Sequence, residues 1–272
     1  MMGLTNALVI NGAGINCEYE TAYALRNAGA NVDIVHVNEI LEGDGRQLED
    51  YQILALSGGF SYGDEIAAGK ILGDNLESKI GEGLRQFVDG GYLVMGICNG
   101  AQAIVKMGYA PGNDGVQIAT IAANDSGGFV DRWIELEFDD KSSASKIYTN
   151  GIEKMHLPIR HGEGRFVFDD GVYDEVVRNH QVVARYVDEV VRDNIHYSPK
   201  PKGDIAGICN KKGNVFSIMP HPEGYQFLGQ SPGWPMEREM LRRAGKPIDA
   251  KAPGAGQKVF DNMVRYSLEQ LV

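Results

Sequence analysis

The stretch GYLVMGICNGAQAI, residues 91–104, joins a short apolar run to a helix-like segment and places one cysteine between them. The run 92–97 predicts a buried strand, and the segment 99–109 predicts a short helix. Cys98 stands at the junction, with a glycine two residues away on either side. A Gly-x-Cys-x-Gly turn of this kind is the cysteine form of the nucleophile elbow, in which small neighbours permit a strained central residue. The same pattern also arises by chance around an inert buried cysteine, so both interpretations stay open at this point.

Strands and helices alternate through the first half of the chain. The pattern predicts strands at 6–10, 32–37, 51–59 and 92–97, and helices at 18–29, 76–91 and 99–109. Because the strands are continuously apolar, we expect an α/β fold with a flavodoxin-like, doubly wound, mostly parallel sheet. Ligands in such sheets bind beyond the carboxyl ends of the strands. Glycine-rich segments occupy those ends in three places, NGAG, SGGFSYGD and GICNG, and so we expect them to converge on one edge.

The second half reads differently, as short strands without regular intervening helices. We expect these strands at 133–138, 165–168, 181–187, 204–210 and 214–220, with a hairpin turn at NKKG (210–213). They predict an added antiparallel region. A Gly- and Pro-rich tract follows, and then a terminal helix at 257–272. No linker divides the chain convincingly, so residues 1–272 are predicted to form one domain with an atypical C-terminal tail, 225–272.

Composition excludes several classes of function. The chain has 272 residues, 43% of them hydrophobic, which is enough for a sizeable core. Its net charge of −11 argues against a nucleic-acid partner. No apolar stretch is long enough to span a membrane and the start lacks a basic signal region, so we expect a cytoplasmic protein without membrane contact. The three cysteines are scattered, which predicts neither a disulfide framework nor a metal site.

A cysteine nucleophile needs a base and a group that orients the base. Of the six histidines, His221 stands out because it follows an apolar strand in SIMPHPEG (217–224). Prolines on both sides stiffen this segment, and Glu223 lies two residues on, within reach of the imidazole. Taken alone, the segment favours a proline-rich turn with a solvated glutamate. The adjacent glycines Gly58 and Gly59 expose backbone N–H groups that suit an oxyanion hole.

With these residues in place, the chain resembles the class I (triad) glutamine amidotransferases. Within that class it is most similar to the glutaminase subunits of phosphoribosylformylglycinamidine synthases. The resemblance rests on five segments in family order: NGAGINCEYET, GGFSYGDEIAAGKI, GICNGAQ, HGEGRF and DIAGICNKKGNVFSIMPHPE. They extend from about residue 6 to residue 223, and GGFSYGD and HGEG are specific to the subfamily.

The resemblance implies a role for each matching residue. Cys98 would be the nucleophile, His221 the general acid and base, and Glu223 the group that orients His221. The oxyanion hole and the glutamine-binding residues would be Gly58, Gly59, Asn99 and Gln102. His161 and Glu163 would line the pocket or face a partner. Cys17 matches a family position, and we expect it to be structural.

The resemblance also implies a reaction and its partners. Cys98 would attack the side-chain amide of L-glutamine, form a glutamyl thioester and release ammonia to an ATP-dependent synthetase subunit of de novo purine biosynthesis. A small accessory subunit is an open addition to that complex. The GxxxxGK[ST] phosphate loop is absent, so no cofactor is expected on this chain, and ATP and magnesium are expected on the synthetase. The alternatives are another class I glutamine amidotransferase subunit and a non-catalytic regulatory subunit of the same fold.

The sequence departs from the family pattern in three places. Gly224 follows the HPE motif where the family commonly has arginine, which puts a local ion pair in doubt. The stretch 196–204 differs from the usual loop. The tail after 224 is longer than typical, and it reads either as a partner-binding insertion or as a covering arm.

Overall fold

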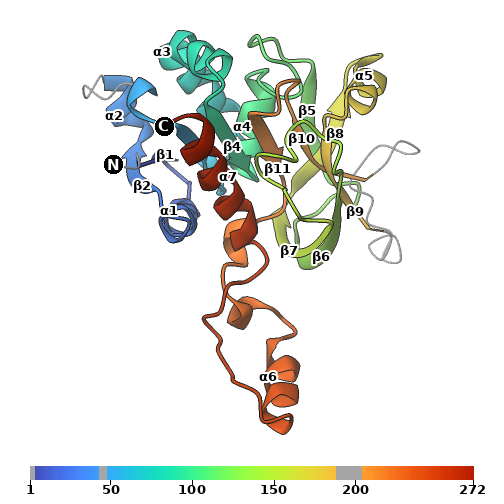
Figure 1. Ribbon diagram of the computed structural model, residues 1–272. Helices are drawn as coiled ribbons and strands as arrows, with labels where there is room; N and C mark the ends of the chain where they lie inside the picture. Colours follow the sequence, from blue (N-terminus) through green and yellow to red (C-terminus); the bar gives the residue numbers. More distant parts are fainter. Residues whose placement is uncertain (1–3, 43–47, 188–203) are drawn as a thin grey trace.

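A nine-stranded mixed sheet forms the centre of the computed structural model, which describes residues 4–42, 48–187 and 204–272 (Figure 1). Its strand order is β2-β1-β3-β4-β11-β10-β9-β6-β7. The parallel half consists of β2 (Asn31–His36), β1 (Asn6–Asn11), β3 (Ile53–Leu56), β4 (Leu93–Ile97) and β11 (Val215–Ile218). The prediction of an α/β fold on a sheet that combines parallel strands with an added antiparallel region is therefore confirmed.

The antiparallel region extends the same sheet beyond β11. It contains β10 (Ile205–Cys209), β9 (Val182–Tyr186), β6 (Val130–Phe138) and β7 (Lys154–His161). The predicted hairpin at NKKG joins β10 to β11, and Gly213 adopts the left-handed conformation that the turn requires, with φ 80°. A separate two-stranded sheet pairs β5 (Ala119–Ala123) with β8 (Glu163–Phe168).

Helices cover both faces of the parallel half. The connections β1→β2 and β3→β4 step in opposite directions along the sheet, so right-handed crossovers place their helices on opposite faces. Accordingly α1 (Glu18–Asn27) packs against α7 (Gln257–Gln270), and α3 (Lys70–Asp89) packs against α4 (Asn99–Lys106). The other helices are α2 (Val37–Glu42), α5 (Val172–Arg178) and α6 (Trp234–Arg243), with short 3-10 turns that include η2 (Ser61–Asp64) and η4 (Pro222–Gly224).

The carboxyl ends of the central strands lie together at one edge of the sheet. Strands β3, β4 and β11 are buried along their whole length, as apolar strands covered on both faces must be. The parallel register pairs Leu56 with Gly96, and Ile97 with Ile218, so these strands end side by side. The segments that follow them, beginning at Ser57, Cys98 and Met219, therefore start from the same edge.

The C-terminal tail forms an arm that projects well beyond the sheet before the chain returns as α7 (Figure 1). At the base of the arm, Leu228 N–H donates to the carbonyl of Ala252 and Gly229 N–H donates to that of Ala250, each over 2.9 Å. Helix α6 lies at the far end, and Trp234 is its only buried residue.

The second half and the tail contain four elements that the sequence patterns did not predict. They are β5, β7, α5 and α6. The atypical loop 196–204 lies outside the described residues except for its last member, and the single-domain boundary stays a prediction. None of the helices in the described part of the chain is long and apolar enough to cross a membrane.

Candidate active site

Cys98 occupies the turn between β4 and α4 with φ 51° and ψ −107°. A positive φ is costly for a residue with a side chain and persists only where the surroundings enforce it. Here the Cys98 N–H donates to the carbonyl of Ile218 over 2.8 Å, which ties the turn to the end of β11. The side chain is 4% exposed, and its sulfur lies 3.5 Å from the carbonyl oxygen of Arg160. This is the geometry of a nucleophile elbow.

The two glycines that flank the cysteine are required by packing. A Cβ on Gly100 would overlap the carbonyl of Leu56. A Cβ on Gly96 would lie 2.7 Å from the backbone carbonyl oxygen of Gly100 on α4. Neither contact is compatible with a larger side chain, so the close approach of strand and helix that creates the elbow depends on glycine.

His221 and Glu223 form a buried hydrogen-bonded pair directly after β11. The Nδ1–H group of His221 donates to Oε1 of Glu223 over 2.5 Å. The backbone N–H of His221 donates to the carbonyl of Pro158 over 2.9 Å, and Pro222 opens the 3-10 turn that carries Glu223. Both side chains are almost fully buried, at 3% and 1% exposure. The carboxylate thereby fixes the orientation and the tautomer of the imidazole.

The environment of His221 favours its protonated form. Burial is the largest single effect and lowers the pKa of the imidazole, but the charges of Glu223 and Cys98 and the hydrogen bonds with Cys17 and Cys98 together outweigh it and raise the pKa well above 6.5. Cys98 acts on this pKa through its charge and through a hydrogen bond, which places the sulfur next to the ring. In the described part of the chain, Nε2 of His221 has no hydrogen bond of standard geometry. That nitrogen is therefore free to exchange a proton with the thiol or with a substrate.

The oxyanion hole is predicted at the backbone N–H groups of Gly59 and Asn99. Gly59 bridges to Ile15, and the hydrogen bonds of this bridge are donated by Phe60 (2.7 Å) and Asn16 (3.2 Å). The N–H of Gly59 itself is not used by the bridge. Asn99 is the first residue of α4, so its N–H has no acceptor within the helix. Their use as an oxyanion hole stays a prediction.

Gly58 has a packing role that the sequence did not reveal. A Cβ at this position would lie 2.8 Å from Cε1 of His221 and 3.3 Å from the sulfur of Cys17. Its carbonyl accepts the N–H of Cys17 over 3.2 Å. Gly58 therefore allows the segment after β3 to approach the imidazole. Its role in the oxyanion hole or in glutamine binding stays a prediction.

The side chains of Asn99 and Gln102 hold three segments together. Oδ1 of Asn99 accepts the backbone N–H of Ser61 over 3.1 Å, and its Nδ2 donates to Asp64 (2.9 Å) and to Oε1 of Gln102 (3.0 Å). Nε2 of Gln102 in turn donates to the carbonyl of Glu163 over 2.6 Å. Helix α4 is thereby fastened to the SGGFSYGD loop and to the HGEG loop.

A buried lysine joins the same network. Nζ of Lys106 donates to the carbonyl of Ala68 over 2.6 Å and lies 3.7 Å from Oε2 of Glu163. Burial lowers the pKa of Lys106, and the charges of Glu163 and Asp64 oppose that shift. Burial and the Glu163 charge raise the pKa of Asp64. Neither Lys106 nor Asp64 was predicted from the sequence, because their importance depends on contacts distant in the chain.

His161 lies close to the triad residues but in the neutral form. Its Nδ1–H donates to Oδ1 of Asn124 over 3.0 Å. Burial, together with the charge of His221, lowers the pKa of His161 to about 3. A histidine with this pKa stays uncharged near neutral pH, and its ring N–H is engaged by Asn124, so the geometry favours a positioning role in the pocket wall.

The structure adds information at two further positions. Cys17, which was expected to be structural, lies against His221 and Glu223. The sequence contained a signal for this, because Cys17 follows shortly after β1, whose carboxyl end belongs to the same edge. Gly224 has a steric reason, since a Cβ there would lie 2.8 Å from Cγ of Pro158.

Comparisons with known proteins find relatives that align with nearly the whole chain. The phosphoribosylformylglycinamidine synthase subunit PurQ of Methanococcus maripaludis is 38% identical over 266 residues, covering 95% of this chain and 96% of that protein. The PurQ subunit of Dehalococcoides mccartyi is 38% identical over 271 residues, covering 98% and 99%.

Solved structures point the same way. A chain in the structure of PurLQS from Thermotoga maritima superposes with a TM-score of 0.69 at 28% identity, covering 97% of this chain and 99% of that one. The model of the CobB/CobQ-like glutamine amidotransferase domain matches residues 5–267. The chain therefore belongs to the CobB/CobQ-like glutamine amidotransferase family.

Proposed function

We propose that this chain is the glutamine-hydrolysing subunit of a phosphoribosylformylglycinamidine synthase and supplies ammonia for de novo purine biosynthesis. The observation that carries the proposal is the buried His221–Glu223 pair beside the elbow of Cys98. It occurs in a chain that aligns with PurQ subunits over nearly the whole length of both.

The proposed reaction uses each group at the edge of the sheet. Cys98 transfers its proton to His221, and the resulting thiolate attacks the side-chain amide of glutamine. The N–H groups of Gly59 and Asn99 stabilise the oxyanion. His221 then protonates the leaving ammonia, and a glutamyl thioester remains on Cys98. Water activated by His221 hydrolyses the thioester, which releases glutamate and regenerates the thiol. Glu223 orients His221 throughout.

The ammonia is used by a synthetase partner that converts formylglycinamide ribonucleotide to its amidine. The similarity to a chain in a structure named PurLQS supports an assembly with a synthetase subunit and a small accessory subunit. We place ATP and magnesium on the synthetase, because this sequence contains no phosphate-binding loop motif. Such an assembly would act in the cytoplasm.

A non-catalytic regulatory subunit of the same fold is the weaker alternative. A subunit that only binds a partner does not need a strained cysteine, nor a nearby imidazole whose pKa a buried carboxylate helps to raise. Such perturbed groups are typical of catalytic sites. Another class I glutamine amidotransferase subunit would keep the same triad, so only the product of the assembled complex distinguishes it from the proposed function.

Co-purification followed by reconstitution tests the proposal. The chain, expressed with a tag in its source cells, should bring down a synthetase subunit. The complex should then convert formylglycinamide ribonucleotide to the amidine with glutamine and ATP. Glutamine hydrolysis by the chain should also rise on addition of the synthetase, its nucleotide and its substrate. A different co-purifying acceptor enzyme, or no rise in glutamine turnover, would contradict the proposal.

A further inference from the structure

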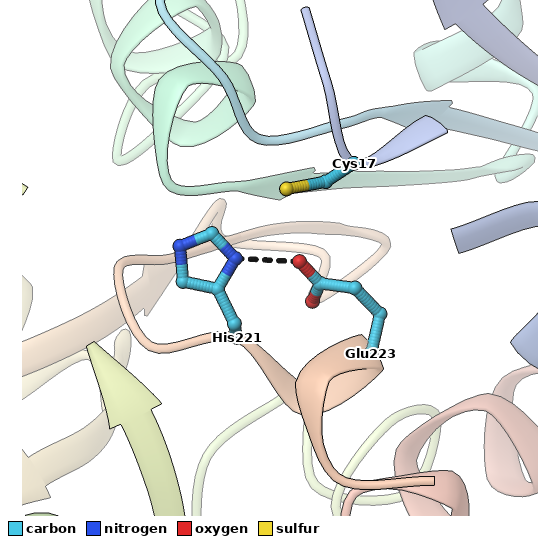
Figure 2. Close-up of side chains that lie close together, drawn as sticks. All are labelled: Cys17, His221 and Glu223. Atoms are coloured by element: carbon cyan, nitrogen blue, oxygen red, sulfur yellow. Dashed lines mark hydrogen bonds and ion pairs between the residues drawn. The ribbon is translucent and has the colours of Figure 1, made fainter. Parts of the chain in front are cut away.

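Cys17 has no part in the proposed reaction, yet its sulfur lies beside the His221–Glu223 pair. Figure 2 shows the sulfur above the edge of the imidazole that carries Nδ1, on the side where Glu223 accepts its hydrogen bond. Ligand atoms of the three side chains all lie within 4.8 Å of one another. Backbone contacts fix this arrangement, since the Cys17 N–H donates to the carbonyl of Gly58 and Cys17 directly precedes α1.

The three side chains form a donor set of a recognisable kind. A thiolate, an imidazole and a carboxylate are the ligands that zinc prefers in proteins, and three protein ligands leave one tetrahedral position open. Cys17 as a thiolate and Glu223 as a carboxylate together carry two negative charges, which a divalent cation neutralises. Hard cations such as Mg²⁺ do not select thiolate, so the set discriminates in favour of Zn²⁺ and similar ions.

The pair of His221 and Glu223 is close to the spacing that such an ion needs. Two ligand atoms on tetrahedral zinc lie about 3.3 Å apart, given bonds of about 2.0 Å. Nδ1 and Oε1 are now 2.5 Å apart, with a proton between them. Replacing this proton by a metal ion opens the pair by less than about 1 Å. In the described part of the chain, Oε2 of Glu223 is buried without a hydrogen-bond partner, so a second carboxylate oxygen is also available.

We propose that Cys17, His221 and Glu223 form an inhibitory site for a thiophilic divalent cation such as Zn²⁺. The ion takes the place of the proton between Nδ1 and Oε1 and bonds to the sulfur of Cys17. With Nδ1 held by the metal, His221 no longer forms the imidazolium that Cys98 needs as its partner, and glutamine hydrolysis stops. Because binding displaces the thiol proton and the shared proton, it tightens as the pH rises. Cys17 is half-buried and is the most exposed of the three ligands.

Metal binding is measured in the full-length Cys98→Ala chain, which lacks the other thiol next to His221. Titration with Zn²⁺ by calorimetry, and with Co²⁺ by its thiolate charge-transfer absorption, should show one site. Adding Cys17→Ser should weaken Zn²⁺ binding at least roughly tenfold and remove the charge-transfer band. Cys209→Ala in the same background is the matched control, because Cys209 is buried on β10 against Ser142 and Ser143, and it should change neither signal. Circular dichroism checks that each variant is folded.

Two outcomes would overturn this site. If Cys98→Ala alone abolishes Zn²⁺ binding, the metal is held by Cys98 and His221 and not by Cys17. If Cys17→Ser leaves the affinity and the charge-transfer band unchanged, Cys17 is not a ligand. Neither result depends on catalysis, so this test can fail while the proposed function stands.

The inhibitory consequence rests on the proposed function and needs an active chain. Zn²⁺ should inhibit glutamine hydrolysis by the reconstituted complex, a chelator should restore it, and Mg²⁺ should not inhibit. With each variant scaled to its own metal-free rate, Cys17→Ser should raise the half-inhibitory Zn²⁺ concentration at least roughly tenfold, and Cys209→Ala should not. Equal inhibition of both variants would refute an inhibitory role for Cys17.

Discussion

The Nδ1–H group of His221 donates to Oε1 of Glu223 over 2.5 Å, within a pair that is almost completely buried. The carboxylate supplies the favourable charge that offsets the cost of burying an imidazolium, and the pKa of His221 is raised as a result. In the proposed reaction, the activity of Cys98 therefore depends on Glu223 through the imidazole of His221.

Replacing Glu223 by glutamine should uncouple this pair while preserving its shape. An amide carries no charge, so the pKa of His221 should fall and the imidazolium should lose its proton at lower pH. The alkaline limb of the pH–rate profile should shift to lower pH, and kcat/KM should drop about 10²–10⁴-fold. Glu175→Gln is the control, since Glu175 is an exposed carboxylate paired with Lys211. An unshifted alkaline limb in the Glu223 variant would mean that this carboxylate does not set the pKa.

His161 should make the fold sensitive to acid. Its pKa is lowered to about 3 in the folded chain and is near 6.5 in the unfolded chain, so below about pH 6.5 the unfolded state takes up a proton that the folded state refuses. The contribution of His161 to the free energy of unfolding is therefore fully present above about pH 6.5 and is lost as the pH falls toward 3. The loss amounts to about 2 kcal/mol at about pH 5. Denaturant unfolding above about pH 6.5 and at about pH 5 should show this loss in the free energy of unfolding for the wild-type chain. The loss should be absent from His161→Gln. The same pH dependence in both chains would assign the acid sensitivity to other groups.

Gly100 should tolerate no side chain. Alanine there would force the new Cβ into the carbonyl of Leu56, and we expect a loss of about 3 kcal/mol or more in the free energy of unfolding, or no folding. Gly128→Ala provides the control, because a Cβ at Gly128 meets no atom within 4 Å. Its effect should stay within about 0.5 kcal/mol. Equal stability of the two variants would show that the elbow has more room than its packing indicates.

The projecting arm should be dispensable for folding. Its base is closed by the two hydrogen bonds between Leu228 and Ala252 and between Gly229 and Ala250. Met236 and Met240 on α6 are 70% and 63% exposed, so removing the helix sacrifices little buried surface. A chain in which residues 231–248 are replaced by a short glycine turn should unfold at nearly the same temperature. A large drop in that temperature would favour a covering arm, whereas unchanged stability with weaker binding of the synthetase would favour a partner-binding insertion.

The elbow and the arrangement of the sheet were predictable because their signals are local. The glycine spacing around Cys98 is enough to predict the elbow, and the short apolar runs are enough to predict the strands. The shared edge follows because the carboxyl ends of parallel strands meet at one edge of a sheet. Strand β7 was missed because Pro158 interrupts its pattern, and proline is accommodated there because β7 is the edge strand of the sheet. Helix α6 was missed because it lies in the Gly- and Pro-rich tract, yet its Pro235 lies in the first turn, where proline is favourable.

The rest of the site could not be predicted, because it depends on contacts between distant segments. The hydrogen bond from Asn99 to Asp64 spans 35 residues, and that from Gln102 to Glu163 spans 61. Cys17 meets His221 only after β1 and β11 are placed in one sheet. No local pattern reports such contacts, so the network became visible only in three dimensions, whereas the place of Cys17 shortly after β1 put it at the right edge of the sheet without naming its partners.

The central claim, that Cys98 is the nucleophile which releases ammonia from glutamine, has one direct test. Cys98→Ala in the reconstituted complex should abolish amidine synthesis from glutamine, because no other sulfur replaces it at the elbow. Synthesis from added ammonia should proceed at the wild-type rate, because the synthetase is intact. Retention of glutamine-dependent synthesis by the variant would contradict the assignment.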